Sequence, residues 1–112
     1  MSTYFLQPVM GGLRFSLADD GAAALLASEV YPSRSSALLH IAAVRAVARQ
    51  DSSYERIGPS DCPWSYRLRD SRGEVLAIGP ACANEADREQ AIIRCKASAP
   101  AGEIVDLPSK CA

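Results

Sequence analysis

The side chain best suited to acid–base chemistry is the only histidine of the 112-residue chain, His40. Catalysis would need a carboxylate, hydroxyl or thiol held beside its ring, and no motif in the sequence brings one there. On a helical wheel His40 flanks an apolar stripe, which is typical of a partly buried or surface histidine. The sequence therefore predicts no catalytic residues.

Carboxylates occur at two expected turns, at Asp19-Asp20 and at Asp70. Such carboxylates can bind a cation or share acid–base work, but turn aspartates are also ordinary partners of the local backbone. Gly11-Gly12 is not a phosphate-binding loop, because no Lys-Ser/Thr and helix follow it. We expect neither a bound metal nor a cofactor.

The cysteines are too widely spaced to form a Cys-x-x-Cys pair; they are Cys62, Cys82, Cys95 and Cys111. The first residues lack the basic and long apolar segments of a signal peptide, and no apolar run approaches the ~20 residues of a membrane span. We therefore expect a soluble, cytoplasmic protein with reduced thiols, with Cys95 in the core and Cys111 on a loose tail.

Arginines form two groups that offer a candidate site for an anion. They lie on one flank of an expected helix (Arg34, Arg45 and Arg49) and around an expected hairpin (Arg67, Arg69 and Arg72). Single-stranded nucleic acid would use such arginines together with Trp64 or Tyr66 for base stacking. A formal net charge of −1 gives no general basic footprint. Solvated arginines beside core aromatic residues are the alternative.

The elements that must position these residues follow from apolar periodicity and turn signals. Alternating Leu13, Phe15 and Leu17 predict a strand, and Asp20-Gly21 predicts a hairpin turn after it. The expected strands are Tyr4–Val9, Leu13–Leu17, Ala22–Val30, Tyr54–Ile57, Trp64–Leu68, Glu74–Ile78 and Glu103–Leu107. The expected helices are Arg34–Gln50, capped by Ser33 or Ser35, and a second from the cap Asn84 to about Lys96.

The first expected helix has two apolar faces. Its inward stripe is predicted by helical spacing and consists of Ala37, Ile41, Val44 and Ala48. The opposite face would normally carry charge, yet it consists of Leu39, Ala42, Ala43 and Ala46. Either these alanines are simply good helix formers, or a second subunit or another partner covers Leu39.

The order of elements recurs at an offset of 51 residues. The residues that match in register are Leu17/Leu68, Asp19/Asp70, Leu25/Leu76 and Ile41/Ile92. We therefore predict one α+β domain built from two tandem β-β-β-α(-β) repeats, about residues 1–50 and 51–112. The repeats are expected to form one continuous antiparallel sheet with both helices packed on one face.

Local motifs add a family resemblance. The first half contains Arg14-Phe15-Ser16-Leu17, Ser28-Glu29-Val30-Tyr31, Ser33-Arg34-Ser35-Ser36-Ala37 and Ile41-Ala42-Ala43-Val44-Arg45, and the second contains Trp64–Leu68, Gly73–Leu76 and Ile92–Lys96. With these motifs the chain resembles the small YegP-like proteins of unknown function. The resemblance implies repeats that share one sheet and exchange a strand, and it implies no activity. The second half departs from the family pattern at Cys82, where a tyrosine is expected. The usual glycine before the helix isoleucine is His40 in one half and Ala91 in the other.

Two functions follow as hypotheses. The missing catalytic motifs and the apolar outer helix face favour a non-enzymatic interaction module, which binds a macromolecular partner or forms a weak homodimer. Weak single-stranded nucleic-acid binding through the arginine groups is the alternative. An enzyme ranks third, because the sequence supplies no reactive constellation.

Overall fold

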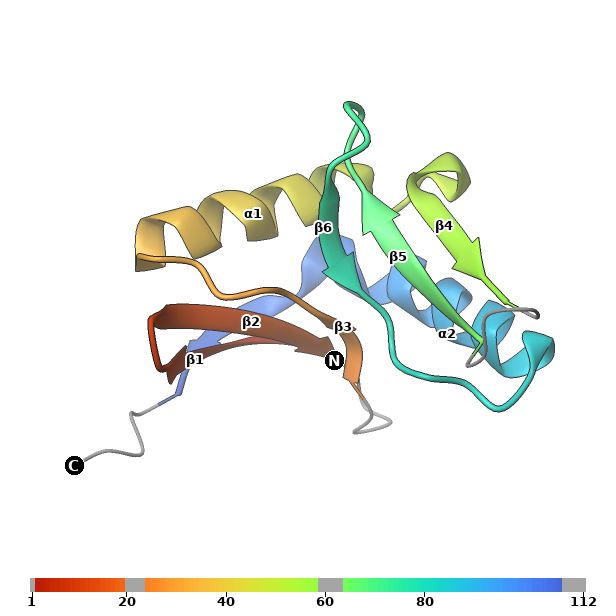
Figure 1. Ribbon diagram of the computed structural model, residues 1–112, viewed down its shortest axis with the longest axis horizontal. Helices are drawn as coiled ribbons and strands as arrows, with labels where there is room; N and C mark the ends of the chain where they lie inside the picture. The colour runs from red at the N-terminus through yellow and green to blue at the C-terminus, as the bar shows by residue number, and fades with distance from the viewer. Residues whose placement is uncertain (1, 20–23, 59–63, 108–112) are drawn as a thin grey trace.

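The computed structural model describes residues 2–19, 24–58 and 64–107. Over these ranges the chain forms seven strands and two α-helices (Figure 1). The strands are β1 (Thr3–Val9), β2 (Gly12–Ala18), β3 (Ala24–Ala27), β4 (Tyr54–Ile57), β5 (Ser65–Arg69), β6 (Val75–Ile78) and β7 (Glu103–Asp106). The α-helices are α1 (Arg34–Val47) and α2 (Glu85–Ser98), and short 3-10 turns, η1 (Asp51–Ser53) and η2 (Ala99–Ala101), precede β4 and β7. Neither α-helix of the described chain has the length and apolar character needed to cross a membrane.

All seven strands form one sheet in the order β4-β5-β6-β3-β2-β1-β7. The predicted α+β class and the single sheet are confirmed. The prediction of a wholly antiparallel sheet is wrong, because β7 runs parallel to β1, with Thr3 beside Glu103. The physical reason is where β7 starts. Its first amide, on Glu103, donates to the carbonyl of Ser2, so the strand begins at the start of β1 and continues in the same direction.

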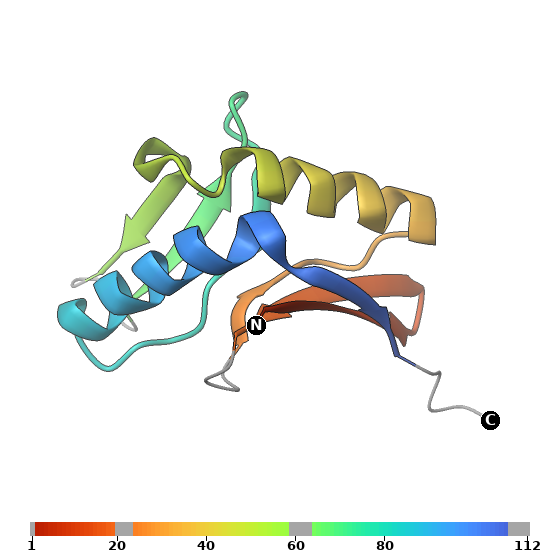
Figure 2. The same cartoon turned by 180° about the vertical axis from the view of Figure 1, so that it is seen from behind.

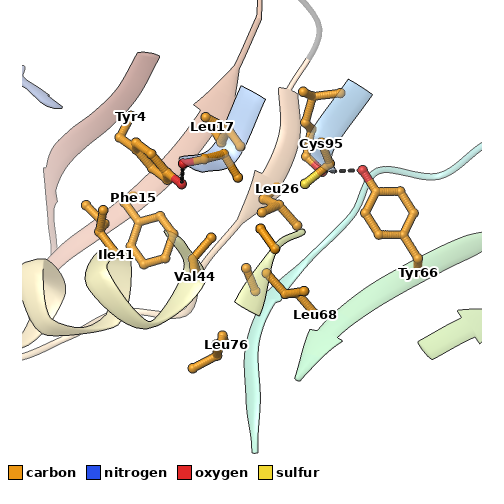
Figure 3. Packing of buried hydrophobic residues seen from close by; sticks show 14 of the residues in the cluster. Tyr4, Phe15, Leu17, Leu26, Ile41, Val44, Tyr66, Leu68, Leu76 and Cys95 are labelled. Carbon is orange, nitrogen blue, oxygen red and sulfur yellow. Dashed lines mark hydrogen bonds between the residues drawn. The ribbon is translucent and has the colours of Figure 1, made fainter. Parts of the chain in front are cut away.

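Both helices lie on one face of this sheet, as Figures 1 and 2 show from opposite sides. Helix α1 begins where the Ser33 hydroxyl accepts a hydrogen bond from the amide of Ser36, and α2 begins where Asn84 does the same for Asp87. The predicted inward stripe of α1 is confirmed, since its members are fully buried: Ala37, Ile41, Val44 and Ala48. Figure 3 shows Ile41 and Val44 packed beside Phe15 in this core.

Two elements end three residues earlier than predicted. The first helix ends at Val47 rather than at Gln50, because the chain tightens into an i→i+3 turn in which the Gln50 amide donates to the Val47 carbonyl. Strand β3 ends at Ala27, and Val30 beyond it is 46% exposed. The predicted Asp20-Gly21 turn lies outside the described residues.

The two halves show matching geometry at the predicted offset. Helix α1 and helix α2 have equal lengths and start 51 residues apart. An isolated antiparallel bridge joins Leu13 to Tyr31 in the first half, and another joins Trp64 to Cys82 in the second. Strand β7 follows the second helix but extends the sheet beside β1 of the first half, which agrees with the exchanged strand that the family resemblance implied. An origin of the halves by duplication stays a prediction.

Candidate binding pocket

Within the single sheet, the strands of the two halves meet between β3 and β6, a boundary that we call the seam. A single residue pair, Ala27 and Ile78, joins the two strands. On one side of this pair the seam is closed by Tyr66, whose hydroxyl donates to the Leu25 carbonyl at 2.5 Å. The Tyr66 ring also fills the space over Gly79, where an added Cβ would lie 2.4 Å from the ring. The Tyr66 ring therefore occupies that side of the seam.

The other side of the seam contains a pocket of about 400 Å³. Here the hydroxyl of Tyr31 reaches the carbonyl of Leu76 at 3.5 Å, a longer contact than the one Tyr66 makes. The pocket wall comes from β3 and the chain after it, from α1, and from β6 and the residue before it. The lining residues are Ala27, Glu29, His40, Glu74, Val75, Leu76, Ala77 and Ile78.

A series of aromatic rings runs from the core to this pocket. Tyr4 meets Phe15 edge-on at 6.1 Å, and Phe15 stacks on Tyr31, also at 6.1 Å. Tyr31 in turn stacks on His40, with ring centres 4.2 Å apart and planes 24° apart. The imidazole is held further by a 2.8 Å contact between its Nδ1 and the Ser36 carbonyl oxygen. His40 is thus a fixed part of the pocket wall, half-buried as the helical wheel predicts.

Two carboxylates complete the polar part of the pocket, Glu29 and Glu74. Both residues are exposed, and neither forms a salt bridge within the described chain. Burial of the Tyr31 ring raises the pKa of its hydroxyl to about 12, and the negative charge of Glu29 adds to that shift. The pocket therefore combines an acidic rim with an imidazole and an aliphatic floor.

Sequence reasoning missed the two glutamates, because they come from loops 45 residues apart in the chain. One signal could have found part of this site. At the 51-residue offset, the positions of Glu29, Tyr31 and His40 are occupied in the second half by Pro80, Cys82 and Ala91. The polar residues that the first half contributes to the pocket are therefore absent from the equivalent positions of the second half.

The predicted interaction face of α1 lies on the outside of the helix. Leu39 is 71% exposed, Ala42 and Ala46 are exposed, and Ala43 is half-buried against the core. This face is separate from the pocket, because none of its residues lines it. Its use as an interface stays a proposal.

The three arginines of the predicted patch on α1 do not share one site, because each has different surroundings. Arg34 forms a two-pronged ion pair with Asp106 in β7, at 2.9 and 3.0 Å. Arg45 donates to the Gly102 carbonyl, and its guanidinium lies 5.3 Å from the centre of the Tyr4 ring. Arg49 is exposed. Two of the three arginines therefore hold the segment that leads into and through β7.

The second arginine group is also engaged. Arg67 and Arg69 both pair with Glu55, at 3.7 and 2.7 Å, whereas Arg72 is exposed. Neither proposed stacking residue presents an open face. The Tyr66 side chain is fully buried, and the half-buried Trp64 lies under the guanidinium of Arg88 at 5.1 Å.

The remaining candidate residues have local roles. Asp70 accepts from the amides of Arg72 and Glu74 at 2.9 Å each, as expected for a turn aspartate. Asp19 forms a two-pronged pair with Arg94. Within the described ranges no three His, Cys, Asp or Glu side chains gather to hold a metal ion. Cys95 is fully buried in the core, as predicted, and Cys82 is half-buried. Asp20, Cys62 and Cys111 lie outside the described residues.

Fold and pocket together define a small α+β protein with a mixed seven-stranded sheet and one two-helix layer. No family model matches the chain. Over 97 residues, covering 87% of both chains, it is 30% identical to a UPF0339 protein encoded in the 5′ region of the ptx operon of Stutzerimonas stutzeri. The chain therefore belongs to the UPF0339 family, the YegP-like proteins.

Solved structures show the same fold. The solution structure of YegP from E. coli, a protein of unknown function, matches with a TM-score of 0.88 and 24% identity, covering 99% of this chain and 96% of that one. The solution structure of a UPF0339 protein from Shewanella oneidensis matches with a TM-score of 0.88 and 18% identity, covering 96% and 92%. At these identities the two structures confirm the fold of this chain and bring no activity to it.

Proposed function

We propose that the chain is a non-enzymatic binding module and that its ligand enters the seam pocket. One observation carries the proposal: the tertiary structure brings Glu29, His40 and Glu74 to the wall of one cavity from three separate segments. A cavity with an aliphatic lining and a few convergent polar groups is the usual form of a ligand site.

The composition of the pocket favours binding over covalent catalysis. Among the described residues that line it there is no serine, threonine, cysteine, lysine or tyrosine, so the candidates for covalent chemistry are confined to His40 and the two glutamates. The buried thiol of Cys95 has its pKa raised to about 11 by desolvation, which further weakens it as a nucleophile.

Two substitutions on one strand test the proposal. Ala27 is exposed and lines the pocket, whereas Ala24 is exposed on the same strand and does not line it. We expect Ala27→Phe to fill part of the pocket and to remove the binding of small compounds found by amide NMR titration. Ala24→Phe should leave that binding unchanged, and bound compounds should be recovered unmodified. Conversion of a compound, or binding that survives Ala27→Phe, would contradict the proposal.

Nucleic-acid binding through the arginines is a separate proposal with less support. Arg34 and Arg45 are occupied by Asp106 and by the Gly102 carbonyl, so a nucleic acid would have to displace contacts within the fold. The apolar outer face of α1 remains the proposed surface for a macromolecular partner or a weak homodimer.

A further inference from the structure

We infer that the seam pocket takes a positively charged nitrogen group, either a primary ammonium or a guanidinium. The group could belong to a free small amine or to a lysine or arginine side chain on a polypeptide. This inference rests on the proposed function and names the chemistry of the ligand.

The first argument is that the polar lining offers acceptors. The Ser36 carbonyl oxygen can only accept a hydrogen bond, so its 2.8 Å contact requires the proton of His40 to sit on Nδ1. In the neutral ring, Nε2 is then an acceptor. Both glutamates of the pocket are acceptors when ionised, as is the Leu76 carbonyl, which keeps a lone pair beside its contact with Tyr31. A ligand that brings several N–H donors matches this set, whereas a carboxylate or phosphate does not.

The second argument is charge. Arginine or lysine pairs with most other carboxylates of the described chain: Asp19, Asp51, Glu55, Glu85, Glu89 and Asp106. Glu29 and Glu74 have no such partner within that part, although both stand at the same cavity. Two unneutralised carboxylates beside a low-dielectric wall concentrate negative potential there, which attracts a cation. The pocket therefore keeps two negative charges without a salt-bridge partner in the described chain, whereas most other carboxylates there are paired.

The third argument is the shape of the floor. Ala27, Val75 and Ile78 contribute aliphatic side chains to the lining, and Ile78 is 51% exposed. An alkyl stem can pack on such a surface while its charged head reaches the glutamates, as lysine and arginine side chains do on proteins. A cavity of about 400 Å³ has room for such a side chain.

A titration with matched probes tests the inference by following backbone amide shifts at low salt. The cationic probes are n-butylamine, Nα-acetyl-lysine amide and Nα-acetyl-arginine amide, and the comparison probes are butyrate and 1-butanol. A capped Gly-Lys-Gly peptide and the same peptide with an Nε-acetylated lysine distinguish the polypeptide source from the free amine. We expect the cationic probes alone to shift the amides of residues 27–29, 40 and 74–78.

Charge-neutralising variants locate the interaction. Glu29→Gln and Glu74→Gln should each weaken n-butylamine binding by about 1.5-fold to fivefold, the range that exposed charge pairs give. Glu103→Gln is the matched control, because Glu103 is exposed on the edge strand β7, away from the pocket. His40→Ala gives the pocket the residue found at the corresponding position of the second half. It should also weaken binding, and the amide spectrum outside the pocket reports whether each variant stays folded.

The outcomes of the titration distinguish the charge inference from the binding-module proposal. Cation-specific shifts at the pocket that the glutamate variants reduce support the inference. Tighter binding of the lysine peptide than of n-butylamine, lost on acetylation, assigns the ligand to a polypeptide, and the reverse order assigns it to a small amine. If butyrate or 1-butanol fills the pocket and the cations do not, the charge inference fails while the binding-module proposal stands. If no probe of any charge shifts the pocket amides, both fail.

Discussion

The hydroxyl of Tyr4 donates a 2.6 Å hydrogen bond to the carbonyl of Ala99, 95 residues later in the chain. Tyr54 donates in the same way to the carbonyl of Ala48 at 2.7 Å. Ala48 and Ala99 are the C-cap residues that directly follow α1 and α2. The Tyr4 bond therefore fastens β1 to the end of the second half's helix, whereas the Tyr54 bond fastens β4 to the end of the helix that precedes it in the chain.

Removing either hydroxyl should destabilise the protein. Tyr4→Phe and Tyr54→Phe each leave a carbonyl at the end of a helix without its partner in the core, at a cost of about 1–3 kcal/mol in the free energy of unfolding. Urea denaturation measures the loss. Tyr31→Phe is the matched control, because its hydroxyl contact is 3.5 Å long and should contribute less. Equal losses in all three variants would contradict this account.

Arg45 should hold the chain that leads into β7. Its guanidinium donates to the Gly102 carbonyl and lies over the Tyr4 ring, so Arg45→Met should lower the free energy of unfolding by about 1–3 kcal/mol. Amide exchange of Leu107, which donates to Leu6 across the β1–β7 pair, should accelerate. Arg49→Met, an exposed change near the same helix end, should leave exchange in β7 as it is.

Stability should fall in acid through Asp51. Hydrogen bonds from Arg56, and then from Lys96, lower the pKa of this carboxyl from 3.8 to about 2. Because the folded-state pKa is the lower one, the carboxylate contributes stability above pH about 4, and this contribution is lost as the pH falls towards 2. Asp51→Asn should flatten the stability profile in that window. An unchanged slope between these pH values would show that Asp51 is not responsible.

The thiols should react in a fixed order. Cys95 is fully buried and its pKa is raised to about 11 by desolvation, so iodoacetamide at pH 8 should modify it only when the protein unfolds. Cys82 is half-buried and should react earlier. Peptide mass mapping after a timed reaction distinguishes the two sites. We also expect all four cysteines to be free thiols under denaturing, non-reducing conditions, and a bridged peptide would contradict that.

The outer face of α1 can be tested apart from the pocket. Leu39 is 71% exposed, so Leu39→Glu should leave the fold intact and abolish any weak self-association or partner docking on that face. Gln90→Glu is the matched control, since Gln90 is the exposed residue 51 positions later, on α2. Sedimentation of the three proteins at high concentration gives the answer. Monomers in every case, with no partner lost, would leave the face without a role.

Local periodicity was enough to predict the elements and their inward sides. The spacing of Ile41 and Val44, repeated by Ile92 and Cys95, predicted which helix face is buried, because a helix repeats every 3.6 residues whatever surrounds it. The caps at Ser33 and Asn84 were predictable for the same reason, since a cap is a contact between neighbours in the chain. The family pattern likewise lies in short motifs that need no three-dimensional context.

The direction of β7 and the composition of the pocket were decided by tertiary structure alone. The sequence of Glu103–Asp106 does not indicate that β7 pairs with β1. The pairing depends on where η2, which precedes β7, places the start of the strand. Glu29 and Glu74 are ordinary exposed acids in the sequence, and they become one site only because β3 and β6 diverge beyond the pair of Ala27 and Ile78. On a helical wheel Arg34 and Arg45 have no partner. A helical wheel cannot show their contacts with Asp106 and with the Gly102 carbonyl, which come from the far end of the chain.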